Sequence, residues 1–470
     1  MFENLFIKSK NIRIIWKKEN VQMVIKRKIY EKLIEWKNSS NKSKAILIKG
    51  ARRVGKSFIT EEFAKREYKS HIMIDFSSPL KGTLRIFEQY GSKYSLDELF
   101  NQLSVLYSTP LYPHESVLVF DEIQRYPQAR ELIKHLVEDG RYDYIETGSL
   151  ISIKKNAKDI LIPSEEEGIS MHPLDFEEFL TAIGDQVTYE ALRKAFLGKK
   201  ALGNTLRSIN ERLRLYMIVG GMPQAVLRYI ETKNYDDVER AKRGIIKLYR
   251  EDIAKYAESY VAEAMAVFNA IPSQLAHHDK KIKYSSLGEG DRFSCYRDAL
   301  NWISESMVGS LCYGVDEPNA FDGFSLQQDK IKCYLADTGL LLTLASGGSY
   351  LKSDLYKSFV AGKTSVNKGM MSENLIAQIF TSKEKPLRFY ETRVKKEGKS
   401  AKYEVDFLIK QSEKTTAVEV KSGKVKEHPS LDYFAHKYKA ETNRPIVLTK
   451  GDLRETEDYL YLPLAMACFL

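Results

Sequence analysis

One short segment has the residues needed to bind the phosphates of a nucleotide. Residues 50–57 read Gly-Ala-Arg-Arg-Val-Gly-Lys-Ser, a full match to the phosphate-binding loop pattern. In such a loop the backbone N–H groups close around the phosphates, the Lys56 amine reaches the β and γ oxygens, and the Ser57 hydroxyl ligates Mg²⁺. The expected nucleotide-binding residues are Gly50, Ala51, Arg52, Arg53, Val54, Gly55, Lys56, Ser57 and Phe58.

A second segment has the carboxylates that hydrolysis requires. Residues 116–122 read Ser-Val-Leu-Val-Phe-Asp-Glu, an apolar run typical of a buried parallel strand that ends in two acids. Ligands of open α/β sheets bind at this end of the strands. We expect Asp121 to hold Mg²⁺, directly or through water, and Glu122 to polarise the attacking water. Lys56 and Glu122 are therefore the first two catalytic candidates.

Hydroxyl side chains follow a third apolar run. Residues 144–149 read Tyr-Ile-Glu-Thr-Gly-Ser, which predicts another core strand. In P-loop ATPases that use a catalytic glutamate, a polar residue at this position senses the γ-phosphate, so Thr147 and Ser149 are both candidates. A strand followed by an ordinary Gly-Ser turn explains either residue equally well.

A separate set of acids and a lysine lies near the C-terminus. Asp406 lies within one predicted strand, residues 404–409. Glu419 and Lys421 stand two residues apart on the neighbouring strand, so the alternation places both on one face. This is the Asp, Glu-X-Lys arrangement of restriction-endonuclease-like nucleases, in which Asp406 and Glu419 would bind Mg²⁺ and Lys421 would orient water. Glu373, on a predicted helix, would complete the metal shell. Alternating charge on an exposed strand explains the pattern without any chemistry.

The spacing of apolar residues predicts the elements that position these groups. A strand ends at Ile48, and helices are expected over 26–37 and, as a lid, over 207–255. The Gly-Gly-Met-Pro break at 220–223 is either a contact near the adenine or a turn between helices. Short helices followed by a strand-turn-strand pattern are expected over 262–344.

These motifs resemble a known family, the AAA-type P-loop ATPases of bacteria and archaea that carry a C-terminal restriction-endonuclease-like domain of the PD-(D/E)XK type. The segments that match, besides the phosphate-binding loop, are Asp-Glu-Ile-Gln at 121–124, Thr-Gly-Ser at 147–149, Met-His-Pro-Leu-Asp-Phe at 171–176 and Val-Gly-Gly-Met-Pro at 219–223. The resemblance implies an α/β fold with a P-loop ATPase core, a helical lid, a winged-helix module and the nuclease-like domain. The domain ranges that we expect are 1–23 for an N-terminal extension, 24–205 for the core, 206–260 for the lid, 261–345 for the winged helix and 346–470 for the nuclease-like domain. Adenine specificity follows from the resemblance and from the lack of an Asn-Lys-X-Asp segment.

The charge balance favours an acidic partner. The 470 residues include 73 Lys or Arg and 63 Asp or Glu, a formal net charge of +10, and nucleic acid is the natural partner of such a chain. Lysine-rich surfaces also serve solubility alone. A basic group in the winged-helix region (Lys280, Lys281, Lys283, Arg292 and Arg297) keeps DNA contact open.

Composition sets further limits. Four cysteines stand without paired spacing, which indicates neither a zinc site nor a disulfide framework and fits a reducing cytoplasm. No apolar run approaches the roughly 18 residues of a membrane span, and no signal-peptide pattern is present, so we expect no membrane partner. Met23 is an alternative start. The sequence leaves a homo-oligomer or a protein partner open. AAA-type ATPases usually hydrolyse ATP at subunit interfaces, and Arg125 and Arg141 are candidates for the arginine that a neighbour supplies.

Two functions remain open on the sequence. In the first, ATP and Mg²⁺ drive a nuclease in which Glu373, Asp406, Glu419 and Lys421 cut DNA. In the second, ATP hydrolysis resets a molecular switch whose C-terminal domain binds nucleic acid or a protein without cutting. An ATPase that handles proteins, with incidental positive charge, is the least favoured alternative.

Overall fold

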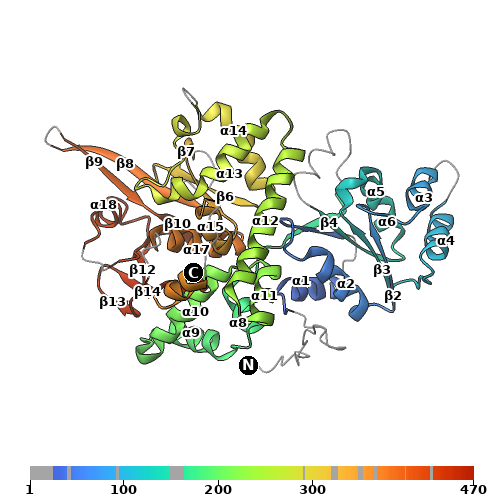
Figure 1. The fold of residues 1–470 in the computed structure, drawn as a ribbon, viewed down its shortest axis with the longest axis horizontal. Coiled ribbons are helices and arrows are strands. Elements are labelled where there is room, and N and C mark those ends of the chain that lie inside the picture. Colours follow the sequence, from blue (N-terminus) through green and yellow to red (C-terminus); the bar gives the residue numbers. More distant parts are fainter. Residues whose placement is uncertain are drawn as a thin grey trace.

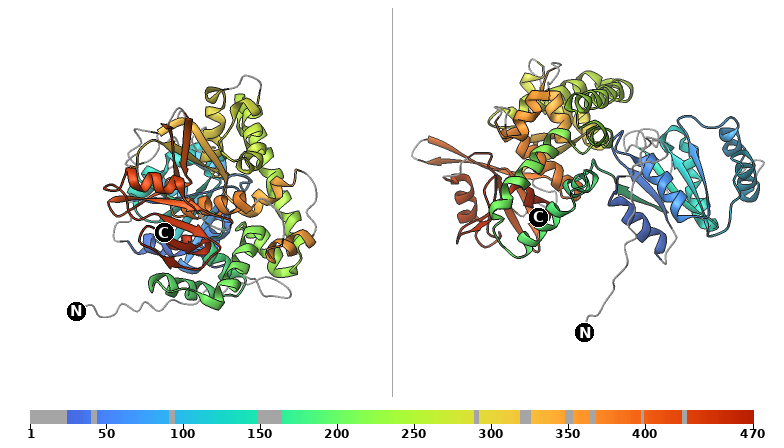
Figure 2. Two further views of the ribbon diagram at one scale, coloured as in Figure 1. Left: turned by 90° about the vertical axis from the view of Figure 1, so that its left-hand side faces the viewer. Right: turned by 60° about the horizontal axis from the view of Figure 1, so that its bottom comes forward.

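The computed structural model describes residues 25–39, 44–90, 95–148, 164–288, 292–318, 326–347, 353–363, 368–396, 399–423 and 427–470. The predicted N-terminal extension, Met23 and Ser149 lie outside the described residues. Figure 1 shows the N-terminal sheet on one side of the molecule and the C-terminal strands on the other, with the long helix α12 between them. The same separation is visible in the right-hand view of Figure 2.

The N-terminal sheet is parallel, with strand order β2-β3-β4-β1-β5. Its strands are β1 (Ala45–Lys49), β2 (Ser70–Asp75), β3 (Ser116–Asp121), β4 (Asp143–Gly148) and β5 (Glu166–Ser170). Every residue of β3 is buried, as its unbroken apolar run predicts. The three predicted core strands are therefore present and adjacent.

Helices cover both faces of this sheet. They are α1 (Ile29–Asn38), α2 (Lys56–Glu67), α3 (Thr83–Gln89), α4 (Leu96–Leu106), α5 (Pro127–Glu131) and α6 (Ile133–Asp139). Alternate residues of β3 face opposite ways: Val117 and Val119 join the core that contains Phe63 of α2, whereas Leu118 and Phe120 join the core beneath α3 to α6. The two covered faces fix the orientation of β3, and its two acids lie at the carboxyl ends of the parallel strands.

A helical region follows the core. It comprises α8 (Phe176–Ala182), α9 (Val187–Leu197), α10 (Leu206–Val219), α11 (Pro223–Thr232) and α12 (Tyr235–Tyr256). The helical pattern predicted over 207–255 thus forms three helices, broken first at the two glycines. Gly221 has no room for a side chain, because an added Cβ would overlap the carbonyl oxygen of Leu174. Gly221 N–H donates to Asp337 Oδ2 at 2.6 Å, which ties this turn to the middle of the chain.

The middle of the chain has two helices followed by a hairpin. The elements are α13 (Val261–Ala276), α14 (Phe293–Glu305), β6 (Gly309–Val315), β7 (Leu326–Leu335), α15 (Thr338–Ala345) and α16 (Ser353–Val360). The antiparallel pair β6 and β7 is the strand-turn-strand feature that the sequence predicts. None of the described helices is long and apolar enough to cross a membrane.

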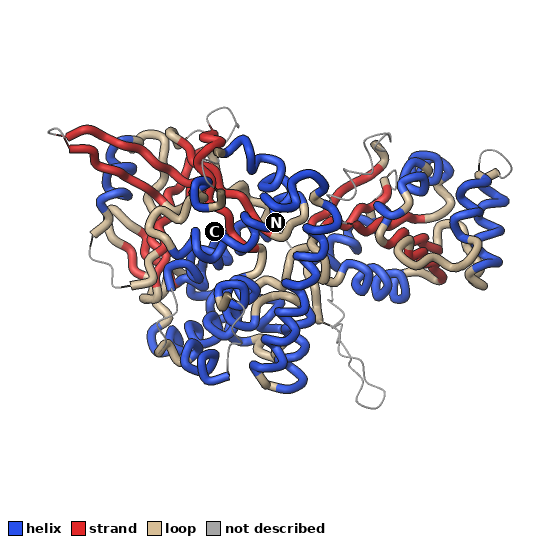
Figure 3. The backbone as a smooth tube through the Cα atoms, turned by 45° about the horizontal axis from the view of Figure 1, so that its top comes forward, coloured by secondary structure: helices blue, strands red, loops and turns tan. Residues whose placement is uncertain are grey.

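The C-terminal region contributes to two sheets, whose strands Figure 3 shows together on the side of the molecule away from the N-terminal sheet. Its elements are α17 (Lys368–Ser382), β8 (Arg388–Lys396), β9 (Lys399–Val405), β10 (Phe407–Gln411), β11 (Lys414–Val420), α18 (Pro429–Lys437), β12 (Ile446–Thr449), β13 (Arg454–Glu455) and β14 (Leu460–Pro463). One sheet has the order β10-β11-β12-β14-β13 and the other β7-β6-β8-β9. Because β6 pairs in parallel with β8, the second sheet crosses the boundary expected at residue 345.

Candidate nucleotide site and C-terminal acidic cluster

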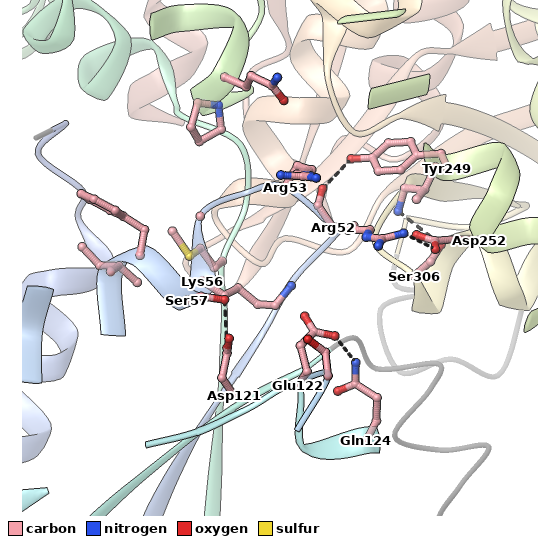
Figure 4. Close-up of a pocket in the computed structure, with 18 of the residues that line it drawn as sticks. Arg52, Arg53, Lys56, Ser57, Asp121, Glu122, Gln124, Tyr249, Asp252 and Ser306 are labelled. Carbon is pink, nitrogen blue, oxygen red and sulfur yellow. Dashed lines mark hydrogen bonds and ion pairs between the residues drawn. The ribbon is translucent and has the colours of Figure 1, made fainter. Parts of the chain in front are cut away.

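A cavity of about 790 Å³ opens where the phosphate-binding loop meets the helical region. Its walls come from the loop, from the end of β3, and from α11, α12 and α14. Six of the nine expected nucleotide-binding residues line it: Arg52, Arg53, Gly55, Lys56, Ser57 and Phe58. Figure 4 shows the Lys56 amine pointing toward the side of the cavity where Glu122, Arg52 and Ser306 lie.

The loop has the compact form that its glycines allow. Gly50 cannot carry a side chain, since an added Cβ would lie 2.5 Å from the Met171 carbonyl oxygen, and Gly55 has a left-handed φ of 100°. Lys56 Nζ donates to the Gly50 carbonyl at 2.9 Å and to the Ala51 carbonyl at 3.2 Å. Burial lowers the pKa of the Lys56 amine. Gly50, Ala51 and Val54 are buried in the loop, behind the cavity wall.

Three side chains from three elements meet around one carboxylate oxygen. Ser57 Oγ donates to Asp121 Oδ1 at 2.9 Å, and the Thr147 hydroxyl donates to the same oxygen. Glu122 N–H in turn donates to Thr147 Oγ1 at 3.3 Å. Burial raises the pKa of Asp121, against the lowering effect of these two hydrogen bonds. A hydroxyl and a carboxylate in contact are the hard oxygen ligands that Mg²⁺ prefers, so Ser57 and Asp121 fit the ion that the sequence implies.

Glu122 has a partner that the sequence analysis missed. Gln124 Nε2 donates to Glu122 Oε2 at 2.6 Å, and both residues line the cavity. Glu122 itself has a left-handed φ of 54°, which is uncommon for a residue with a side chain. The Gln within the Asp-Glu-Ile-Gln segment was the available signal, but only the turn after β3 brings its amide back to the acid.

Helix α12 holds the loop from the opposite side of the cavity. Arg52 Nη1 lies 2.7 Å from Asp252 Oδ1, and the Tyr249 hydroxyl donates to the Arg52 carbonyl at 3.2 Å. Burial raises the pKa of Asp252, which the nearby Arg52 opposes. Pro223, from the glycine-proline break, also lines the cavity. The helical spacing around Tyr249 predicted a helix but not these contacts of Tyr249 and Asp252 with the loop.

The two arginine candidates lie in different surroundings. Arg125 lines the cavity and stacks over the ring of Tyr256 at 6.0 Å. Arg141 lies between two acids, with Nη1 2.6 Å from Asp97 Oδ1 and Nε 2.8 Å from Asp139 Oδ2. Both arginines thus make contacts within their own chain, and the arginine that a neighbour supplies stays a prediction.

The four C-terminal candidates converge. Asp406 lies between β9 and β10, and its Oδ2 accepts the Val420 N–H at 2.8 Å, which places it beside Glu419 at the end of β11. Lys421 Nζ contacts Glu419 Oε1, as the Glu-X-Lys spacing predicts. Glu373 of α17 is almost fully buried nearby. Burial and the neighbouring Glu373 raise the pKa of Asp406 to about 7.

Lysines from the middle of the chain enter this acidic cluster, which the sequence did not predict. Lys280 Nζ contacts Glu373 Oε2, and Lys332 Nζ lies 3.3 Å from Glu373 Oε1 and 2.8 Å from Glu404 Oε1. These lysines hold the pKa of Glu373 at about 2, although burial alone would raise it. Among the described residues, no group of three or more His, Cys, Asp or Glu side chains is arranged to hold a metal ion.

The same contacts change the interpretation of the basic group. Lys280 and Lys281 were expected to face an acidic partner, but Lys280 binds Glu373 and Lys281 binds Glu391. Lys283, Arg292 and Arg297 are exposed. Part of the positive charge in this region therefore neutralises acids of the same chain.

Family models match three successive stretches of the chain. Residues 42–180 match an AAA domain, residues 210–350 a domain of unknown function (DUF8612), and residues 368–467 another domain of unknown function (DUF4143). No curated protein matches the sequence.

Several solved structures are distantly similar. A Drosophila ORC chain, solved with DNA, is 12% identical over 72% of this chain and 95% of its own, with a TM-score of 0.27. PCH-2 of C. elegans is 10% identical over 48% and 68% of the two chains, and Cdc6p of Pyrobaculum aerophilum 11% over 68% and 88%, each with a TM-score of 0.23. TM-scores this low do not establish a shared fold. The match of residues 42–180 to the AAA domain model, the parallel sheet and the loop geometry agree, and they support a P-loop ATPase core in the N-terminal part of this chain.

Proposed function

We propose that this protein binds ATP with Mg²⁺ in the 790 Å³ cavity, hydrolyses it, and uses the cycle as a molecular switch that controls binding of nucleic acid to the middle and C-terminal parts of the chain. The carrying observation is the meeting of Ser57, Asp121 and Thr147 beside Lys56, all at the carboxyl ends of β1, β3 and β4. This is the edge where parallel α/β sheets bind ligands.

Each residue has a separate task in hydrolysis. Lys56 leaves its two loop carbonyls and meets the β and γ oxygens, while the N–H groups at the start of α2 bind the phosphates. Ser57 and Asp121 would hold Mg²⁺, which neutralises charge on the phosphates when bound. Glu122 accepts a proton from the attacking water, and Thr147 positions Asp121 and the Glu122 backbone.

The cavity also supports coupling between nucleotide and the rest of the chain. Tyr249 and Asp252 of α12 contact the loop, and Trp302 and Ser306 at the end of α14 line the same cavity. A ligand there touches both the AAA domain and the middle of the chain. A change at the γ-phosphate therefore has a direct route to α12 and α14.

Nucleic acid is the partner that the charge supports best. The order α13, α14, β6 and β7 supports the winged-helix interpretation, and Lys283, Arg292 and Arg297 leave exposed positive charge on it. Phosphate contacts by such residues bind DNA without reading sequence and weaken with salt.

A second candidate function is Mg²⁺-dependent cutting of DNA by the C-terminal region. The convergence of Glu373, Asp406 and Glu419 favours it, together with Lys421. The lysines among these acids favour the switch instead, because they already neutralise two of the three carboxylates.

The test measures three activities of the full chain with Mg²⁺: ATP hydrolysis, DNA binding with and without ATP, and DNA cutting. We expect hydrolysis to be lost in Lys56→Ala and to fall by about 10²-fold or more in Glu122→Gln. Lys65→Ala is the control, since Lys65 lies on the exposed side of α2 with Glu61. Salt-sensitive DNA affinity that changes with nucleotide, without cutting, supports the switch. Cutting that Asp406→Ala abolishes supports the nuclease, whereas absence of ATP hydrolysis would refute the switch.

A further inference from the structure

Two lysines from the middle of the chain occupy the interior of the C-terminal acidic cluster. Lys332 of β7 is fully buried, and its Nζ lies 2.8 Å from Glu404 Oε1 and 3.3 Å from Glu373 Oε1. Lys280 reaches the other oxygen of Glu373 and lies 3.8 Å from Asp406 Oδ1. The two ammonium groups therefore lie among the carboxylates that would bind a divalent cation.

Each carboxylate of the cluster has at least one oxygen that is engaged by a protein donor. Glu373 Oε1 also accepts the Tyr334 hydroxyl, and Asp406 Oδ2 accepts the Val420 N–H at 2.8 Å. Glu419 Oε1 is bound by Lys421, whereas Glu419 Oε2 is buried without a hydrogen-bond partner in the described part of the chain. A magnesium ion needs several oxygens at about 2.1 Å in near-octahedral geometry. The arrangement does not offer that set while both lysines are in place.

The charges agree with the geometry. Two ammonium groups supply the same charge that one divalent cation would bring. An added cation would stand beside both in a buried site, where like charges repel strongly because little water screens them. Each carboxylate of the cluster thus has at least one lysine partner without any metal, as buried charges require.

The two lysines differ in how firmly they are held. Lys332 is in the strand β7 and has no exposed side-chain surface, so the sheet and its buried surroundings hold it in place. Lys280 follows α13 in the short connector before Ile282, has a left-handed φ of 50°, and keeps 21% of its side chain exposed. Helix α13 packs against α12, which lines the nucleotide cavity. Lys280 is therefore the lysine that a movement of α13 could withdraw.

We propose that Lys280 and Lys332 take the place of the divalent cation, so that the predicted nuclease metal site is closed, and that Lys280 is the plug whose removal opens it. This goes beyond the proposed switch and does not depend on ATP hydrolysis. Its readout is metal binding, so its failure and the failure of the ATPase assignment are distinguishable.

The experiment counts Mn²⁺ ions bound per chain by electron paramagnetic resonance, without nucleotide. The protein is the full chain carrying Asp121→Asn, which silences the loop site. We expect no Mn²⁺ at the cluster with Lys280 present. In Lys280→Met we expect one bound Mn²⁺, with an affinity at least about tenfold higher than that of the chain with Lys280 intact. Adding Asp406→Asn should remove that ion. Lys281→Met is the matched control, because Lys281 binds Glu391 and not Glu373 or Asp406.

Two results overturn the proposal. Mn²⁺ binding by the chain with Lys280 intact, lost in Asp406→Asn, would show that the site is already open. No gain of Mn²⁺ in a Lys280 variant that melts cooperatively would show that Lys280 is not the plug. Lys280→Gln is measured beside Lys280→Met so that a folded variant is available, and the measurement on intact Lys280 needs no variant of that lysine.

Discussion

Gln124 Nε2 donates a hydrogen bond of 2.6 Å to Glu122 Oε2, and the two side chains lie on the same wall of the nucleotide cavity. A carboxylate that accepts this bond is partly engaged before any water reaches it. The left-handed φ of Glu122 fixes the backbone from which the acid projects. Gln124 is therefore placed to control when Glu122 meets water.

We predict that Gln124→Ala raises the rate of ATP hydrolysis without Glu122 losing its role. The amide no longer competes with water for the carboxylate, so kcat should rise by about two- to fivefold, and the affinity for ATP should stay within twofold. Steady-state kinetics and calorimetric ATP titration measure the two quantities. A fall in kcat comparable to that of Glu122→Gln would show instead that Gln124 orients the acid productively.

We predict that Asp252→Asn tightens ATP binding. The substitution removes a negative charge from the cavity wall and frees Arg52, now 2.7 Å from Asp252, to meet phosphate. One unit charge near a protein surface changes the free energy by about 1 kcal/mol or more, or roughly fivefold in Kd. Titration at low and high salt checks this, with exposed Glu251→Gln on the same helix as control. Unchanged affinity would mean that Arg52 does not reach the ligand.

We predict that Gly221→Ala destabilises the protein by about 1–3 kcal/mol. The added methyl group would overlap the Leu174 carbonyl oxygen, and the Gly221 N–H could not keep its 2.6 Å bond to Asp337. Gly244→Ala is the contrast, because nothing lies within 4 Å of its added Cβ and it sits inside α12. That change should stabilise by about 0.5–1 kcal/mol. Urea unfolding of both variants gives the comparison, and equal stability would contradict it.

We predict that Lys332→Met destabilises the protein by about 3–5 kcal/mol, because it removes one partner from a buried ion pair. Glu373 and Glu404 would keep their charge with less compensation. Adding Glu373→Gln should recover part of the loss, since it removes a carboxylate as well. Lys330→Met serves as control, as Lys330 is about a third exposed and meets Glu391 at 3.5 Å. Additive losses in the double variant would show that the two residues do not interact.

Stability should fall as the pH drops from about 6.5 to about 4. Burial lowers the pKa of His172 from 6.5 to about 4, so the folded protein binds fewer protons than the unfolded chain across this interval. The free energy of unfolding is therefore highest, as far as His172 contributes, above pH 6.5, and it declines as the pH falls toward the folded-state pKa of His172. Thermal melting of the native protein and His172→Gln at several pH values tests this, and the variant should show the shallower slope. Parallel slopes would exclude His172 as the cause.

The nucleotide site was largely predictable, because its chemistry is local. The loop at 50–57 and the acids at 121 and 122 each lie within a short segment, and a buried parallel strand presents its end in a known place. Thr147 was one of two candidates, and it meets Asp121 because β4 is the neighbour of β3. Ser149 stays a prediction outside the described residues.

The C-terminal site was predictable only in part. Asp406, Glu419 and Lys421 come together because two adjacent strands carry them. Lys280 and Lys332 were invisible as partners, since 93 and 41 residues separate them from Glu373. A lysine in a basic stretch gives no sign of whether it faces water or an acid from a distant strand. Two residues of the basic group that kept DNA contact open, Lys280 and Lys281, therefore pair with acids of the same chain.

The pairing of β6 with β8 limits where this chain can be truncated or its parts exchanged. A fragment that ends near residue 345 would keep β6 and β7 but lose β8, the strand on the other side of β6. It would also keep Lys332 without its partners Glu373 and Glu404. Exchange of the last domain alone would likewise leave the edge of β6 unpaired and the Lys332 charge without its partners. The smallest portion that keeps these contacts intact runs back past Lys280, so the middle and the end of the chain constitute one structural unit.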